Sequence, residues 1–374
     1  MISFKEAKSI IQGKIFKLDS EVVPLDRSMG RIIFENVVAT FPSPRFNNSA
    51  MDGFAVRSSD IIGASKGNPI TLKNIGISSA GVPSDLILNE GECMQCMTGA
   101  KIPLGSDAIV MVEHTTGFSD DPNVQIMIEV QPESHIRKRG EEIQKGDKLI
   151  SKGTHITPSE IGICATFGYG ELNVSKKPKI AIFGTGNELV EPGENLKEGE
   201  IYNSNLYVFS DLVGKAGGEV LMQDVLKDNK SYLESFLSEA LKSCDVVISS
   251  GGVSMGRFDY VRDVFIDLGV EEHFWKVAQK PGRPLFFGTG NKTLIIGLPG
   301  NPVSSYIGFM IWVWPALENM MSKKGSKPLI GTLTKSFPRE SVKKRFLFGN
   351  AWIKNGELVC YPASKVGSHM LTSA

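Results

Sequence analysis

A short apolar run leads directly into a glycine-rich turn at Lys179-Ile-Ala-Ile-Phe-Gly-Thr-Gly-Asn-Glu188, where the chain changes character. Downstream of it, short apolar runs alternate with longer amphipathic segments. Strands are expected at 179–183, 219–222, 245–249, 284–287 and 293–296, and helices at 205–216, 230–242, 260–268 and 303–320. This alternation predicts a mostly parallel sheet with helices packed against it.

The region before this run has a different pattern, with short alternating segments separated by Gly and Pro. Such spacing predicts a β-rich module between residues 50 and 139. The strand candidates are Val56, 70–72, 86–88, 108–112 and 124–128.

Four domains are expected, and the first is discontinuous. Ser3 and Glu6 form an S-x-x-E capping box that predicts a helix at the start of the chain. The predicted fold class is therefore multidomain α/β plus β. The predicted domains are 1–43 with 140–176 (N-terminal helix and linking domain), 44–139 (β-rich module), 177–326 (α/β domain) and 327–374 (C-terminal β domain).

Composition and charge exclude several classes of function. The 374 residues are 41% hydrophobic and 22% charged, as is typical of globular proteins. Lys plus Arg equals Asp plus Glu at 41 each, so nothing favours nucleic acid or an anionic membrane as a partner. Residues 1–8 mix Lys and Glu, unlike a signal peptide, and the longest apolar run, 306–314, is too short to cross a bilayer. We expect a cytoplasmic protein.

The cysteines agree with a reducing compartment, because there are five, an odd number, without an export signal. Cys93 and Cys96 have the spacing of a metal or redox pair, but no second pair accompanies them. They lie in a strand-like run, where these two positions point to opposite faces. A structural role is therefore favoured over a metal site.

Three glycine-rich loops follow predicted strands of the α/β region. Ligands of open α/β sheets bind beyond the carboxyl ends of the strands. Loops of this kind expose backbone N–H groups that can hold phosphate or another oxyanion. The loops are 183–188, 249–254 and 298–302, and the candidate substrate-binding residues in the last two are Ser250, Gly251, Gly252, Ser254, Pro299, Asn301 and Pro302.

Charged residues beside these loops indicate the kind of ligand. Glu188, Asp228 and Asp259 follow successive strands, and three carboxylates near an anion call for a hard cation such as Mg²⁺. The alternative is that each acid stabilises a helix N-terminus. Lys276 and Lys280 lie among Pro and Gly and suit phosphate or another oxyanion, although a solvated loop would have the same composition.

The sequence contains no evident Ser-His-Asp or Cys-His set, Walker motif or GxGxxG. Covalent catalysis and dinucleotide binding are therefore disfavoured. The residues alone indicate an anion and metal site on an α/β sheet.

Five segments carry a resemblance to a known family: NNSAMDGFAV at 47–56, MTGA at 97–100, RKRGEE at 137–142, SSGGVSMG at 249–256 and LPGNP at 298–302. Together they resemble the MoeA family, which includes the E domain of gephyrin. The first segment is highly specific, whereas the last two also occur in MogA-type proteins. The resemblance covers almost the whole chain.

The resemblance implies an elongated subunit with a MogA-like α/β sandwich domain, β-rich modules and a C-terminal β domain. It implies a homodimer with shared active sites, in which the α/β domain of one subunit faces the β-rich module of the other. The implied enzyme is a molybdopterin molybdenumtransferase, which converts adenylylated molybdopterin and molybdate into molybdenum cofactor and AMP with a divalent cation, here Mg²⁺. Other molybdenum cofactor biosynthesis proteins are implied partners.

Matching positions also imply roles for single residues. Asp52, as a catalytic acid, belongs with Thr98 and Arg137 to the β-rich side of the site. Arg345 and Ser368 complete a molybdate pocket from the last domain.

On the α/β side, Glu188, Asp228 and Asp259 match acids implicated in metal binding and in cleavage of the phosphoanhydride. Lys276 and Lys280 match basic residues that face phosphate or molybdate.

The chain departs from the family at Asn187 and Glu142, where Asp is common, and it ends before the strands that usually follow, so a shortened last domain is expected. Two other functions fit the sequence less well. A MogA-type adenylylation would need only the α/β domain, and the 47–53 segment argues against it. A scaffold like gephyrin would not need the matched acids.

Overall fold

The computed structural model describes residues 1–227, 230–252, 260–325, 328–336 and 342–363. The chain divides into two compact units. The first comprises Met1–Asn36, Ser151–Ala165 and Tyr169–Ala374, and the second comprises Val37–Ile150 with Thr166–Gly168. The finer division into four domains stays a prediction.

The first unit is built on a six-stranded sheet. Its strands are β12 (Lys179–Thr185), β15 (Glu219–Leu226), β16 (Val246–Ser250), β17 (Glu271–Lys276), β19 (Pro284–Gly290) and β20 (Thr293–Leu298), in the order β15-β12-β16-β20-β19-β17. The first four in this order pair in parallel, β19 is antiparallel to β20, and β17 is antiparallel to β19. Five strands therefore run in one direction, and the predicted mostly parallel sheet is confirmed.

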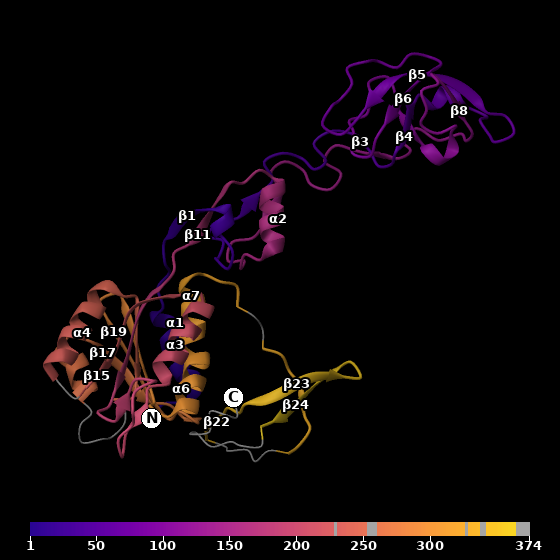
Figure 1. The fold of residues 1–374 in the computed structure, drawn as a ribbon. Coiled ribbons are helices and arrows are strands. Elements are labelled where there is room, and N and C mark those ends of the chain that lie inside the picture. The colour runs from indigo at the N-terminus through magenta and orange to yellow at the C-terminus, as the bar shows by residue number, and fades with distance from the viewer. Residues whose placement is uncertain (228–229, 253–259, 326–327, 337–341, 364–374) are drawn as a thin grey trace. The chain divides into compact units, whose positions relative to one another are not determined.

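Helices cover both faces of this sheet, because successive strand residues point into two different cores. Ile180 and Ile182 pack on one side, and Ala181 and Phe183 pack on the other. Figure 1 shows α1, α3, α6 and α7 together on one side of the sheet and α4 on the other. The helices are α1 (Phe4–Lys14), α3 (Asn205–Lys215), α4 (Lys230–Ser243), α5 (Tyr260–Asp267), α6 (Pro302–Gly308), the π-helical η4 (Phe309–Val313) and α7 (Trp314–Met320).

Two helix predictions have different outcomes. The capping box is confirmed, since the Glu6 N–H donates to Ser3 Oγ at 3.1 Å and the Ser3 N–H donates to the Glu6 carboxylate at 3.4 Å. The buried residues of α1, Ala7 and Ile11, join the core of the α/β sheet. The single helix predicted at 303–320 is instead three successive segments, because a π-helical turn interrupts it.

Shorter elements complete the first unit. A linking segment pairs β1 (Ser20–Pro24) with β11 (Glu171–Ser175) beside η1 (Leu25–Arg27) and α2 (Pro158–Thr166). Near the sheet, β13 (Leu189–Val190) pairs with β14 (Ile201–Tyr202), and β18 (Gln279–Lys280) pairs with β22 (Lys344–Arg345). The last small sheet contains β21 (Thr332–Leu333), β23 (Gly349–Lys354) and β24 (Glu357–Pro362).

The second unit is β-rich, as predicted. Its five-stranded sheet has the order β7-β4-β6-β5-β8, formed by β4 (Gly53–Val56), β5 (Ile70–Ser78), β6 (Glu92–Cys96), β7 (Ala108–Met111) and β8 (Asn123–Ile126). The strand predicted at 86–88 is wrong, since this segment makes only an isolated bridge from Ile87 to Leu104. The remaining elements are β2 (Val37–Val38), β3 (Asn48–Ser49), η2 (Ser58–Ile61), η3 (Val112–His114), β9 (Ile136–Arg137) and β10 (Lys148–Ile150).

The two cysteines of the C-x-x-C segment lie in a strand with opposite orientations, as expected. Cys93 packs into one hydrophobic cluster and Cys96 into another. Burial raises the pKa of the Cys93 thiol to about 12 and that of Cys96 to about 11. Both thiols therefore stay protonated near neutral pH and serve as core residues.

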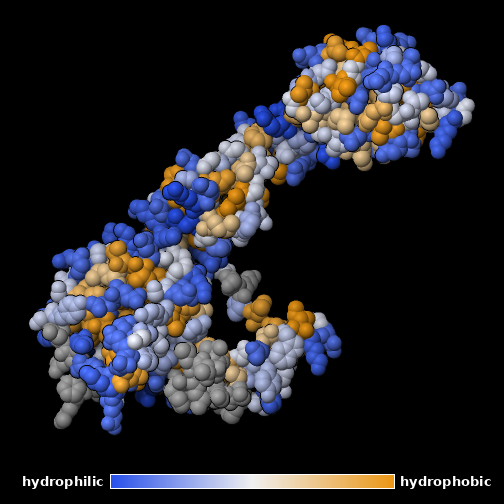
Figure 2. Space-filling view, in the orientation of Figure 1, coloured by the Kyte–Doolittle hydropathy of each residue, from blue (hydrophilic) through white to orange (hydrophobic). Residues whose placement is uncertain are grey.

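The surface is mixed in character. Figure 2 shows hydrophobic residues scattered among hydrophilic ones over the visible face. Of the helices that the structure describes, none has the length and apolar character needed to span a membrane.

Gly53 offers a test of the packing in the second unit. A Cβ atom there would lie 1.9 Å from the Val110 carbonyl oxygen, so the Gly53→Ala variant must push β4 away from β7. We expect a loss of about 1–3 kcal/mol in stability, as for other overpacked sites. The control is Gly67→Ala, where no atom lies within 4 Å of the added Cβ.

Hydrogen exchange on peptides spanning 53–56 and 108–111 measures this effect locally. Tryptophan fluorescence would miss it, because all four tryptophans belong to the first unit. Equal exchange in the two variants would contradict the packing described for Gly53.

Candidate functional site

The loops predicted to bind ligand meet at one edge of the six-stranded sheet. The carboxyl ends of β12, β16 and β20 lie there side by side, since Gly184 pairs with Ser250 and Ser250 pairs with Leu298. The end of β17 reaches the same edge, where Lys276 is opposite Pro284. This is the edge at which open α/β sheets bind ligands.

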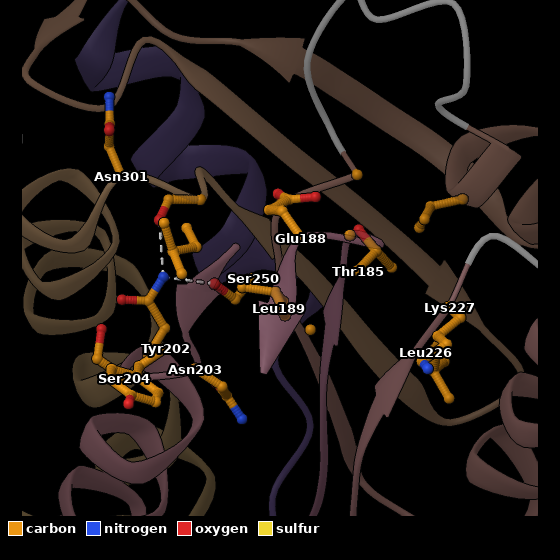
Figure 3. Close-up of a pocket in the computed structure, with 18 of the residues that line it drawn as sticks. Thr185, Glu188, Leu189, Tyr202, Asn203, Ser204, Leu226, Lys227, Ser250 and Asn301 are labelled. Carbon is orange, nitrogen blue, oxygen red and sulfur yellow. Dashed lines mark hydrogen bonds between the residues drawn. The ribbon is translucent and has the colours of Figure 1, made fainter. Parts of the chain in front are cut away.

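A cavity of about 650 Å³ lies at this edge. Figure 3 shows Asn301 on one side of it, Leu226 and Lys227 on the other, and Glu188, Thr185 and Ser250 between them. The predicted residues that line it are Glu188, Ser250, Gly251, Gly252, Asn301 and Pro302. The structure therefore brings parts of all three glycine-rich loops to one cavity.

The loop after β16 requires glycine for two reasons. Gly251 and Gly252 have φ angles of 87° and 68°, in the left-handed region that other residues rarely adopt. A Cβ on Gly252 would also lie 2.5 Å from a methyl carbon of Val261 and 2.7 Å from the Thr185 hydroxyl oxygen. The backbone of this loop is thus packed directly against its neighbours and can approach a ligand closely.

Asn205, which sequence reasoning missed, holds two of the loops together. Its side-chain amide donates to Ser250 Oγ and to the Gly300 carbonyl, both at 2.7 Å. The Ser305 hydroxyl donates to its oxygen at 3.3 Å. These partners are 45 to 100 residues away in sequence, so no local motif announces the contact.

A short flap, residues 189–204, forms another wall of the cavity through Leu189, Ile201 and Tyr202. The Glu191 carboxylate stabilises the conformation of this segment. It accepts hydrogen bonds from the Asn203 amide and the Tyr207 hydroxyl, both at 2.9 Å. The bond to Glu191 raises the pKa of Tyr207.

Of the three predicted metal-binding acids, Glu188 is the one within the described residues. Its carboxylate lies close to Gly186, where an added Cβ would meet it at 2.5 Å. Asp228 and Asp259 lie outside the described residues, as do Ser254 and Ser368. Within the described ranges, no group of three His, Cys, Asp or Glu side chains could hold a metal ion. Glu188 supplies the hard oxygen donor that Mg²⁺ prefers.

Two lysines on the cavity wall were also missed. Lys227, directly after β15, and Lys230, at the start of α4, both line the cavity. Figure 3 shows Lys227 on the side opposite Asn301. Lys230 forms ion pairs with Asp267 at 3.1 Å and Glu234 at 3.6 Å, and its bond to Asp267 raises its pKa.

A second cavity, of about 450 Å³, is lined by basic side chains. Lys280 and Arg345 are directly paired where β18 meets β22, so the two predicted residues do come together. Arg283 and Lys343, which were not predicted, line the same cavity, and none of its described lining residues is acidic. Such a lining suits an oxyanion.

A smaller cavity of about 190 Å³ borders the other two. It shares Gly251 and Asn301 with the first and Gly282 and Ser304 with the second, and the predicted Pro299 lines it. Lys276 is not among the described lining residues of these three cavities. Its ammonium nitrogen lies 4.2 Å from the ring centre of Trp275.

In the second unit, Asp52 and Thr98 are hydrogen-bonded partners. One Asp52 oxygen accepts from the Thr98 backbone N–H at 2.7 Å and from its hydroxyl at 2.9 Å. The backbone bond, and then the hydroxyl bond, lower the pKa of Asp52. Nearby, Arg137 pairs with Asn48 between β9 and β3, and Ser49 exchanges backbone hydrogen bonds with Gly99 and Ala100. The segments at 47–53, 97–100 and 137–142 therefore lie together.

The Asn205 contacts predict a loosening of the loops in the Asn205→Leu variant. Losing one net hydrogen bond costs about 1 kcal/mol, so the Gly251 amide should exchange about five- to tenfold faster. This amide donates to the Leu298 carbonyl at 3.0 Å and reports on the loop. Ser210→Ala, on the same helix, is the matched control, and unchanged exchange at Gly251 would refute the role of Asn205.

The Asp52–Thr98 pair predicts a pH effect. Because the folded-state pKa of Asp52 is depressed, the pair stabilises the fold above the unfolded-state pKa and loses this effect as the pH falls through the folded-state value. In Thr98→Val the hydroxyl bond is lost and the backbone bond stays, so the pKa of Asp52 should rise part of the way to its ordinary value.

Carboxyl-carbon NMR titration of aspartate-labelled protein measures this pKa. Thr71→Val, an exposed site on β5, is the control. An Asp52 pKa that is the same in wild type and Thr98→Val would show that the hydroxyl bond is unimportant.

Comparison with known proteins agrees with this geometry. A family model described as the MoeA N-terminal region (domain I and II) matches residues 2–168, and one described as a probable molybdopterin binding domain matches residues 181–319. The molybdopterin molybdenumtransferase of Staphylococcus epidermidis (strain RP62A) is 35% identical over 364 residues, covering 97% of this chain and 86% of the relative. The enzyme of the same name from Staphylococcus aureus (strain Mu50) has the same identity and coverage.

A solved structure is also similar over the full length. The molybdopterin biosynthesis MoeA protein from Pyrococcus horikoshii OT3 matches with a TM-score of 0.85 and 30% identity, covering 100% of this chain and 92% of that one. The predicted multidomain α/β-plus-β fold class is thereby confirmed. From these matches, which extend over nearly all of its residues, the chain belongs to the MoeA family.

Proposed function

We propose that the protein is a molybdopterin molybdenumtransferase, which makes molybdenum cofactor and AMP from adenylylated molybdopterin and molybdate. The observation that carries the proposal is the set of three neighbouring cavities at one sheet edge, which share lining residues. The first is large enough for a nucleotide-linked ligand and offers loop N–H groups, and the second is lined by cations. This arrangement suits two substrates, one of them a small oxyanion.

In the proposed reaction, the loops after β16 and β20 bind the phosphates of adenylylated molybdopterin in the first cavity. Lys280 and Arg345 hold molybdate in the second, where their charges offset those of the dianion. Water attacks the phosphoanhydride and AMP leaves. The two dithiolene thiols then displace one oxygen of molybdate, which takes up their protons and leaves as water. We place Lys276 with these basic residues on the resemblance alone.

We also propose that Glu188, with Asp228 and Asp259, holds Mg²⁺. When bound, this cation supplies charge neutralisation at the phosphoanhydride. The support is the position of Glu188 on the wall of the first cavity and the oxygen chemistry of the three side chains.

We also propose that the protein is a homodimer. The partner subunit would complete the site with Asp52, Thr98 and Arg137. The substrate pockets would also include Ser254 and Ser368. The family resemblance and the exposed Asp52–Thr98 pair support this arrangement. The enzyme would act in the cytoplasm and exchange substrate and product with other molybdenum cofactor biosynthesis proteins.

The decisive experiment is AMP release from adenylylated molybdopterin, with Mg²⁺ and molybdate each omitted in turn. We expect release to require both. Glu188→Gln and Asp259→Asn should each slow release by about 100-fold or more while still binding the pterin, because they remove charge needed at the reacting phosphate.

Glu219→Gln, an exposed acid at the start of β15 and outside the cavity lining, is the matched control and should release AMP at the wild-type rate. Tight pterin binding by the wild type without AMP release under any condition would refute the transferase. Release at full rate without a divalent cation would refute the metal assignment alone.

A further inference from the structure

A buried amide lies directly behind the turn that carries the cations of the second cavity. Gln279 is 1% exposed and belongs to β18, and the turn consists of the four residues that follow it, 280–283. Every residue from Gln279 to Arg283 borders this cavity. A polar side chain buried this deeply must have hydrogen-bond partners, and its partners show what it holds in place.

The Gln279 amide links the turn to the hydrophobic core. Its oxygen accepts from the indole N–H of Trp312 at 3.0 Å. Its nitrogen donates to the Gly282 carbonyl at 2.8 Å and to the Pro281 carbonyl at 3.4 Å. Trp312 is 2% exposed, packs against the ring of Phe4 at 4.8 Å, and lies in the π-helical segment η4. Both donors and the acceptor of the amide are therefore used between a fixed core residue and the turn.

The fit between Gln279 and the turn is close. Gly282 has a φ angle of 80°, and a Cβ atom there would lie 2.9 Å from the Gln279 amide nitrogen. With its carbonyls bonded inward, the turn presents Lys280 and Arg283 to the cavity. The Gln279 amide thus holds the middle of the turn, while a backbone bond from the Val277 N–H to the Arg283 carbonyl at 3.1 Å holds its end.

The other side of the cavity is attached to the same short strand. The Phe346 N–H donates to the Lys280 carbonyl and the Lys344 N–H donates to the Ala278 carbonyl, both at 2.9 Å. These bonds bring Lys343 and Arg345 to the cavity. Four like charges around one space repel each other, so their spacing has to be imposed by the backbone that carries them.

We propose that Gln279 is a positioning residue for oxyanion binding: through Trp312 it fixes the 280–283 turn and so sets the spacing of the cations in the second cavity. The inference rests on the proposed function in taking molybdate as the oxyanion. Gln279 itself acts through the turn, and the cations make the contacts with the anion.

The test uses the full-length protein and the variants Gln279→Leu and Trp312→Phe. Gln279→Leu keeps most of the volume but removes all three bonds, and Trp312→Phe keeps an aromatic ring but removes the donor. We expect each to weaken molybdate binding, measured by calorimetry, by about tenfold, because small displacements of charged donors are costly. The KM for molybdate in AMP release should rise in parallel, with kcat changed less than about twofold.

The double variant provides a sharper readout. If the indole acts on the anion only through Gln279, the combined variant should bind molybdate about as weakly as either single variant. Thr293→Val is the matched control: it deletes a hydroxyl that is 2% exposed and donates to the Cys244 carbonyl at 2.8 Å, in the same unit. It should leave the molybdate affinity unchanged.

The outcomes separate this inference from the proposed function. Wild-type protein that binds molybdate but releases no AMP would refute the transferase, while the binding comparison still decides the role of Gln279. Equal molybdate affinity in wild type and Gln279→Leu, an equal loss in Thr293→Val, or no binding by the wild type would each overturn the inference. Should Gln279→Leu not fold, Trp312→Phe carries the same comparison.

Discussion

Burial of both faces of the six-stranded sheet is the constraint on which the rest of the first unit depends. All residues of β16 and β20 are buried, and alternate positions face separate hydrophobic cores. At the centre of a sheet covered in this way neither face is polar, so charged and ligand-binding groups near these strands lie at the strand ends. Because five strands point the same way, one edge collects their loops, and the three cavities lie there.

The sequence predicted this part of the fold well because strands buried on both sides are continuous apolar runs, which stand out from amphipathic helices. The strands at 179–183 and 293–296 and the helix at 205–216 were recognised from that contrast. Elements set by tertiary contacts were less visible. The segment 86–88 has the composition of a strand but lacks a neighbouring strand along its length, and the π-helical turn within 303–320 leaves no mark on the hydrophobic period.

Site residues that belong to local sequence motifs could be predicted from the sequence. Site residues that are placed by hydrogen bonds between distant segments could not. Glu188, Ser250 and Asn301 follow from glycine-rich loops at strand ends. Asn205 and Gln279 do not, because an amide in a helix or a short strand has no distinctive spacing. The bonds that join Asn205 to Ser250 and Gln279 to Trp312 span 45 and 33 residues. These two amides hold backbone in place beside the cavities, which is a task that the sequence alone does not display.

The interleaving of the chain between the two units has a consequence for the order in which the protein assembles during synthesis. The second unit is one nearly continuous stretch, Val37–Ile150, and contains its own cores. The first unit closes last, since Ile2 bridges to Val277 and the Leu18 N–H donates to the Met320 carbonyl. Synthesis proceeds at about 5–20 residues per second. The apolar side of α1 therefore stays exposed for tens of seconds until the residues that cover it have left the ribosome. The inserted module can fold within that interval, so α1, which is synthesised before the module, is buried after it.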